Sequence, residues 1–275
     1  PNSAPFESGT LLLVSLAAED SKLAGINLVH ELVHSALPSS RPWVYEGLAH
    51  FAEAMYRQEQ GGREAALDLL GLHRAAFLDS EKEVSVALKK NLGQKSVEER
   101  SVGQKNVGQP LATTFDETYY RSKAAYVWWM LRDMIGDDAL KQAISKYRAE
   151  DDKDPKYVEQ LIEAAAKRDL GWFFGDWVYK DRGLPDFHVQ SAHPWTENGV
   201  LFVTVTLENL GDAGAEVPFT IFFEGGEITK RIEVRAKSTA TTRVELSGKA
   251  SEIVVNDGSV PESDLTNNEF KIGAQ

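Results

Sequence analysis

Hydrophobic and polar positions change their pattern near residues 183–185, and this change divides the chain into two parts. Before it, long stretches are rich in Ala, Leu, Glu and Lys, which are good helix formers. Pro38 and Pro42 cannot lie inside a helix, so they separate two helices within residues 20–59. Gly, Gln, Ser and Asn dominate residues 91–113 and indicate a long loop. We expect further helices at 62–90, 116–135, 137–149, 155–167 and 169–180.

The second part carries short β-branched and aromatic runs that are punctuated by Gly and Asn clusters. The clearest of these runs lie at 200–207, 219–223, 228–234 and 241–246. About seven short strands in such a segment are typical of a small antiparallel β-sandwich. The pattern therefore predicts an α+β protein, with a mainly helical domain at 1–185 and a β-sandwich domain at 186–275.

The segment His30-Glu31-Leu32-Val33-His34 carries the most informative chemistry of the chain. Residues four apart share one face of a helix, so both imidazoles can reach one metal ion. Glu31 lies about 100° around the helix from His30 and can flank the same cleft. From there its carboxylate can accept a proton from water that zinc has made more acidic. The spacing therefore predicts a metal site that activates water.

Apolar residues surround this motif on nearly all sides, so we expect its helix to be buried. Burying a carboxylate and two imidazoles without partners would cost several kcal/mol. A bound metal ion removes that penalty, which favours a metal site over a chance match on a surface helix.

Composition narrows the choice of metal ligands and partners. The chain has no cysteine, so any metal must be held by His, Asp or Glu. A formal charge of −12 argues against nucleic acid or an anionic membrane as a partner. No apolar run approaches the roughly 20 residues that span a bilayer. The chain begins at Pro1 rather than Met, so we expect a processed form or a fragment, and the oligomeric state stays open.

The segment Trp43-Val-Tyr-Glu46-Gly-Leu-Ala-His50-Phe-Ala-Glu53 follows the motif. Together the two segments resemble the gluzincin zinc peptidases, and among them the aminopeptidase N-like family. The resemblance implies a thermolysin-like catalytic domain with one zinc ion per chain and Glu46 as the third zinc ligand. Eleven residues separate His34 from Glu46, whereas the family usually has eighteen, and that spacing falls on Glu53 instead. With Glu46 as the ligand, His50 and Glu53 become candidates that orient the ligands, and His50 can equally be an ordinary histidine beside the site.

Two further segments resemble parts of the same family. Glu7 lies where the family binds the free amino group of its substrate, and the alternative is an ordinary loop glutamate. Residues 119–132 resemble the helix whose tyrosine stabilises the oxyanion. Alignment places Arg121 at the tyrosine position, so we expect a small bulge that moves Tyr120 into it, with Tyr119 as the alternative.

The resemblance implies hydrolysis of peptide or protein substrates, more in the manner of an aminopeptidase than of an endopeptidase. Glu31 would act as the base and Tyr120 as the oxyanion donor. The alternative function is a non-catalytic binding or scaffold module that zinc stabilises, or an inactive fragment of a larger peptidase. Residues 256–268 resemble the closing strands of adhesion-like β-sandwich modules of bacterial extracellular proteins, which implies a periplasmic or secreted location.

Overall fold

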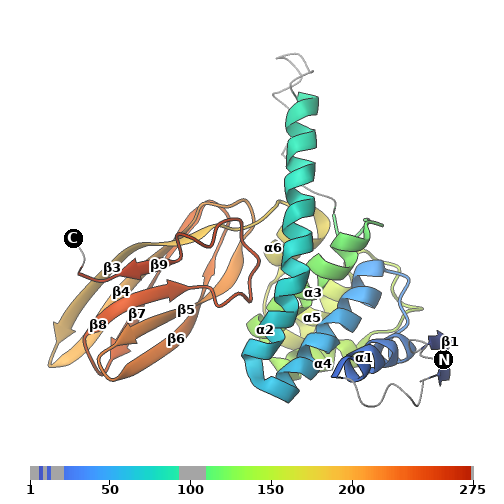
Figure 1. The fold of residues 1–275 in the computed structure, drawn as a ribbon, viewed down its shortest axis with the longest axis horizontal. Helices are drawn as coiled ribbons and strands as arrows, with labels where there is room; N and C mark the ends of the chain where they lie inside the picture. Colours follow the sequence, from blue (N-terminus) through green and yellow to red (C-terminus); the bar gives the residue numbers. More distant parts are fainter. Residues whose placement is uncertain (1–5, 9–10, 14–21, 93–109, 274–275) are drawn as a thin grey trace. The chain divides into compact units, whose positions relative to one another are not determined.

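The computed structural model describes residues 6–8, 11–13, 22–92 and 110–273 of the chain. The chain forms two compact units, Pro1–Asp181 and Arg182–Gln275. We call them the helical unit and the β unit, and Figure 1 shows both.

The helical unit begins with two short antiparallel strands, β1 (Phe6–Ser8) and β2 (Leu11–Leu13), which contact the first helix. Its helices follow the expected order along the chain. They are α1 (Lys22–Ala36), α2 (Pro42–Leu92), the π-helix η3 (Thr118–Lys123), α3 (Ala124–Ile135), α4 (Asp137–Lys146), α5 (Tyr157–Ala166), α6 (Gly171–Phe174) and the π-helix η4 (Gly175–Tyr179).

Local sequence explains where α2 begins and bends. Pro42 occupies the first position of the helix, where a missing N–H group leaves no intrahelical hydrogen bond unmade. Gly61 and Gly62 interrupt its helical geometry, and Gly62 has a φ of 80°, which favours glycine. The break falls between the second of the two helices predicted within 20–59 and the helix predicted at 62–90.

Helix α2 is central to the packing of the helical unit, because it contacts α1, η3 and α3. The side chains of Trp43 on α2 and of Trp128 and Trp129 on α3 are almost fully buried. The Trp43 and Trp128 rings stack with centroids 5.4 Å apart. This aromatic contact fixes the start of α2 against α3, and the start of α2 carries the candidate site.

The β unit consists of two antiparallel sheets. One has the strand order β3-β4-β7 and the other β6-β5-β8-β9. Alternate residues of β4 are buried, as are several of β5, which is the pattern of strands that cover a shared core. Strands are observed at β3 (Phe187–Glu197), β4 (Val200–Asn209), β5 (Ala215–Phe223), β6 (Gly226–Val234), β7 (Ser238–Leu246), β8 (Ala250–Val255) and β9 (Glu269–Lys271). The chain is therefore a mixed α+β protein.

The expectation that the motif helix is buried was wrong. Among the described side chains of α1, His34 alone is buried, and Leu32 is 48% exposed. The helix packs on α2, and the two histidines of the motif face that neighbour. Helix α1 therefore has apolar residues on nearly all of its faces, but not every face is buried. None of the helices in the described part of the chain has the length and hydropathy needed to cross a membrane.

Candidate metal centre

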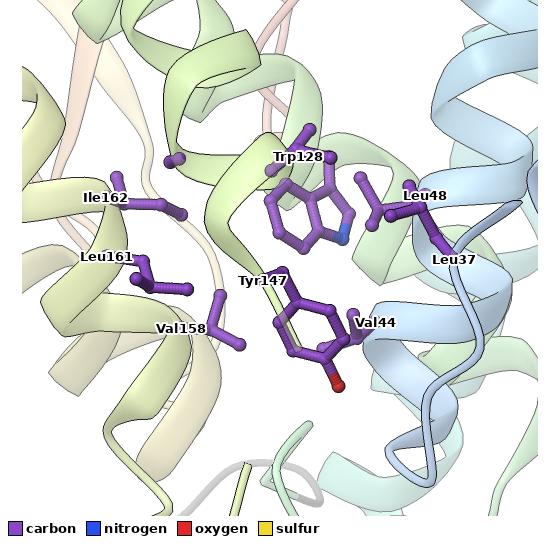
Figure 2. A pocket seen from close by; sticks show the side chains of 10 residues that line it. Leu37, Val44, Leu48, Trp128, Tyr147, Val158, Leu161 and Ile162 are labelled. Carbon is purple, nitrogen blue, oxygen red and sulfur yellow. The ribbon is translucent and has the colours of Figure 1, made fainter. Parts of the chain in front are cut away.

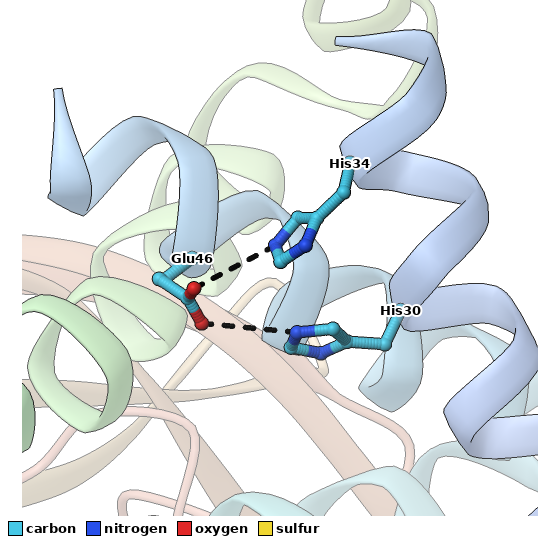
Figure 3. A group of neighbouring side chains, drawn as sticks. All are labelled: His30, His34 and Glu46. Carbon is cyan, nitrogen blue, oxygen red and sulfur yellow. Dashed lines mark ion pairs between the residues drawn. The ribbon is translucent and has the colours of Figure 1, made fainter. Parts of the chain in front are cut away.

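Helices α1 and α2 bring His30, His34 and Glu46 together. The chain reverses after α1 through a segment that contains both Pro38 and Pro42, so the first turn of α2 lies beside the motif. His30 Nε2 lies 3.7 Å from Glu46 Oε2, and His34 Nε2 lies 3.8 Å from Glu46 Oε1. Figure 3 shows the two imidazoles pointing at the carboxylate from the neighbouring helix. One donor atom from each residue lies within 4.8 Å of the other two.

These donor atoms fit a divalent cation. Two donors bound to one zinc ion at about 2.0–2.2 Å lie roughly 3.4 Å apart in tetrahedral geometry, close to the observed separations. Within the described residues, His34 Nε2 and Glu46 Oε2 are buried without a hydrogen-bond partner. Buried polar atoms rarely stay unsatisfied, because each costs about 1–3 kcal/mol. A cation between them would satisfy both, and two imidazoles with a carboxylate suit zinc.

Glu53 lies on the other side of the histidines from Glu46. Its carboxylate accepts hydrogen bonds from His30 Nδ1 at 2.9 Å and from His50 Nδ1 at 2.8 Å. Burial raises the pKa of Glu53, but these two hydrogen bonds outweigh it and lower the pKa to about 2. Such carboxylates fix the ring orientation of metal-binding histidines. His30, His50 and Glu53 also lie close enough together to hold a metal. The hydrogen bonds from the two histidines to Glu53 already explain why these three side chains lie together.

The two motif histidines have different electrostatic surroundings. Burial lowers the pKa of His30, but its hydrogen bond to Glu53 and the nearby carboxylates outweigh burial, so the pKa is raised. Burial, together with the positive charges of neighbouring histidines, lowers the pKa of His34 to about 4. The His34 ring also stacks on Tyr45 with centroids 3.8 Å apart. His34 is therefore held as a neutral imidazole at neutral pH, which is the form that binds metal.

Gly47 explains why a glycine follows the candidate ligand Glu46. A Cβ atom at this position would lie 2.6 Å from Ala124 Cβ and 3.0 Å from the indole of Trp128. Both neighbours belong to α3. Only glycine lets α2 approach α3 this closely, and that approach sets the position of Glu46.

The π-helix η3 lies where the sequence predicts a bulge. Arg121 Nε lies 3.3 Å from Glu46 Oε2, and the same guanidinium pairs with Glu117. Tyr120 is half-buried and takes no part in the hydrogen bonds and ion pairs of the cluster among the described residues. π-Helical turns are frequent at functional sites. The structure therefore places Arg121 beside the candidate ligand, and the predicted role of Tyr120 as oxyanion donor stays a prediction.

Two residues after Arg121, Lys123 is completely buried. Its ammonium pairs with Asp181, which is also completely buried. The ammonium lies 5.5 Å from the centroid of the Phe77 ring, 5.6 Å from that of Tyr119 and 5.7 Å from that of Trp177. Tyr119 thus belongs to the packing around Lys123. Sequence reasoning missed this pair because its members are far apart in the chain.

Two other residues of the predicted site are Glu31, within the motif, and Glu7, on a strand that contacts the motif helix. Glu31 is half-buried on α1, and its negative charge contributes to the raised pKa of His30. The backbone of Glu7 lies in β1, opposite Leu12 of β2, and both strands contact α1. The side chain of Glu7 lies outside the described residues.

A pocket elsewhere in the helical unit is apolar and contains none of the candidate ligands. Figure 2 shows its lining, which includes Leu48, Trp128, Tyr147 and Ile162. The Tyr147 hydroxyl lies 2.8 Å from Ser39 Oγ and 2.9 Å from a carboxylate oxygen of Asp152. Among the described lining residues of this pocket, Tyr147 alone is ionisable.

Comparison with family profiles finds no match, and comparison with curated protein sequences finds none either. Among solved structures, the chain is similar to Legionella pneumophila aminopeptidase A, determined in complex with aspartic acid. The TM-score is 0.54 at 15% identity, over 87% of this chain and 26% of that one. The fold is peptidase-like. The chain spans about a quarter of the length of that aminopeptidase. A second similar structure is the CARDB domain of the PF1109 protein of Pyrococcus furiosus in complex with di-metal ions, at a TM-score of 0.27 and 16% identity, over 31% of this chain and 83% of that one.

Proposed function

We propose that the chain is a zinc-dependent peptidase of the gluzincin type, with His30, His34 and Glu46 holding the metal. The convergence of two imidazoles and a carboxylate from two helices carries the proposal, and His34 Nε2 is buried without a hydrogen-bond partner among the described residues. When bound, zinc supplies a Lewis acid that polarises a carbonyl and makes water more acidic. We further propose that the helical unit is a thermolysin-like domain and that the β unit is an adhesion-like β-sandwich. The proposal also includes an extracytoplasmic location.

Each residue of the cluster has a distinct role in this proposal. Glu31 takes a proton from the attacking water and passes it to the nitrogen of the leaving amine. Glu53 holds the ring of His30 through Nδ1, so that Nε2 stays directed at Glu46. The oxyanion donor is Tyr120 by the resemblance, and Arg121 is a second candidate because it lies beside Glu46. If Glu7 binds the substrate's amino group, the enzyme is an aminopeptidase.

Metal content and hydrolysis test the proposal together. Wild-type protein purified without added metal should contain about one zinc ion per chain by elemental analysis. Glu46→Ala should lose the ion, whereas Glu53→Ala should only weaken binding, by about 10–100-fold. Glu31→Gln should keep the ion and lose hydrolysis of a broad peptide library. Wild type that holds no zinc, even after zinc is added back, would refute the proposal.

A non-catalytic, zinc-stabilised module is the second candidate function. The specific observation in its favour is Arg121, which occupies the position of the family's tyrosine and pairs with Glu46. Zinc-loaded protein that cleaves no peptide in the library would support this candidate. Because the chain spans about a quarter of the similar aminopeptidase, a longer form should be tested in parallel.

A further inference from the structure

His50 has the same surroundings as the candidate ligand His30. Both residues direct Nδ1 at Glu53, at 2.8 Å for His50 and 2.9 Å for His30. Both direct Nε2 at Glu46 Oε2, at 3.9 Å for His50 and 3.7 Å for His30. The Glu53 carboxylate thus orients two rings in the same way, one from each helix.

Glu53 binds Nδ1 of His50 and leaves Nε2 of the ring for another partner. Within the described residues, His50 Nε2 is buried and has no hydrogen-bond partner, as is the case for His34 Nε2 and Glu46 Oε2. Because Nδ1 donates its hydrogen to Glu53, Nε2 of the neutral ring carries a lone pair. A buried lone pair that faces a carboxylate oxygen is unfavourable unless a cation or a hydrogen-bond donor lies between them.

The spacing of Glu46 and His50 supports a cation. The two residues are four apart on α2, so they share one face of the helix, as His30 and His34 do on α1. The His30 ring neighbours both of the other rings, with its centroid 4.5 Å from that of His34 and 4.8 Å from that of His50. Each helix therefore contributes two donor residues to this cluster.

We infer that His50 is a fourth protein ligand, so that three imidazoles and one carboxylate hold the metal ion. The inference rests on the metal site of the proposed function and adds a donor to it. The three nitrogens each lie 3.7–3.9 Å from an oxygen of Glu46. The group of donor atoms that lie within 4.8 Å of one another contains His30, His34 and Glu46 without His50, so the His50 ring has to move toward the other two rings when it binds the same ion. Zinc sites that react usually have three protein ligands, whereas closed sites have four. Reaction at this centre then requires a fifth coordination position or the departure of His50.

The number of histidines bonded to the metal tests the inference without measuring activity. The chain, with NMR-active nitrogen in its six histidines, is loaded with an NMR-active cadmium isotope, which replaces zinc. Direct coupling between the metal and Nε2 identifies each bonded ring. We expect three coupled rings in wild type and two in His50→Gln. The matched control is His73→Gln, because the His73 ring lies 4.8 Å from that of His50 but its Nδ1 is 3.2 Å from Ser122 Oγ. This control should keep all three couplings.

The outcomes separate this inference from the proposed function. Two coupled rings in wild type, those of His30 and His34, would overturn the inference and leave the zinc peptidase in place. His50 would then face water or substrate instead. Absence of any coupled ring would overturn both. The number of coupled rings in the wild type tests the inference even if His50→Gln does not fold.

Discussion

Replacing Gly47 with alanine should weaken both the helical unit and its metal site, although alanine is the better helix former. The added Cβ would lie 2.6 Å from Ala124 Cβ, about 1 Å closer than the 3.5–4.0 Å of a normal contact between carbon atoms. It would also press on Trp128, whose indole N–H donates to the carbonyl of Trp43 at 3.2 Å. The overlap involves the Cβ of Ala124 and the ring of Trp128, so no long flexible side chain can relieve it.

The net effect is the difference between two opposing contributions. Overpacking of this kind costs about 1–3 kcal/mol, and the severity of the overlap places it near the upper end of that range. Replacing glycine with alanine inside a helix stabilises it by about 1 kcal/mol. We therefore expect Gly47→Ala to lose about 2 kcal/mol of unfolding free energy. Displacing Glu46 by a fraction of an ångström should also weaken zinc binding at least about tenfold.

Gly71 offers a matched control on the same helix, because a Cβ there meets nothing within 4 Å. Gly71→Ala should gain about 1 kcal/mol, so the two variants should differ by about 3 kcal/mol. Urea unfolding followed by tryptophan fluorescence is a suitable assay, because five of the six tryptophans lie in the helical unit. Adding Ala124→Gly to Gly47→Ala should restore part of the loss. Equal stability of the two single variants, with wild-type zinc affinity, would refute the reasoning.

Two further predictions concern buried charges. Lys123→Met should destabilise the helical unit by about 3–5 kcal/mol, because it removes the ammonium that pairs with buried Asp181. Adding Asp181→Asn should recover part of that loss in urea unfolding, and an unchanged midpoint in Lys123→Met would show that the pair contributes nothing. In the β unit, burial raises the pKa of Glu262 from its ordinary 4.5 to about 7, so the folded state binds more protons between these pH values. Stability should therefore fall by on the order of 3 kcal/mol from pH 4.5 to above 7. Hydrogen exchange of β8 in the whole chain, corrected for the intrinsic exchange rate, should show this fall, and Glu262→Gln should abolish it.

Much of the fold could be predicted from the sequence because its signals are local. Good helix formers and the prolines at 38 and 42 gave the helices of the first part, and β-branched runs gave the strands of the second. The burial of α1 could not be predicted in this way. An apolar residue such as Leu32 shows what a side chain favours, whereas its exposure depends on what packs against it.

The sequence likewise predicts some relations within the candidate site and leaves others to the tertiary structure. Sequence spacing alone determined that His30 and His34 share a face of α1 and that Glu31 flanks it, because the geometry of one helix fixes these relations. Helix periodicity likewise placed Glu46, His50 and Glu53 on one face of α2. It could not say which carboxylate lies near Nε2 of the histidines and which near Nδ1.

Only the tertiary structure decided those relations. It placed Glu46 at the Nε2 side, Glu53 at the Nδ1 side, and the free nitrogen of His50 beside Glu46. It also put Arg121 of a separate helix against the same carboxylate. The physical reason is that the pitch of a helix sets neighbours within it, whereas neighbours across helices depend on packing distances. Here the distance between α2 and α3 depends on Gly47, because a larger residue at this position would overlap with Ala124.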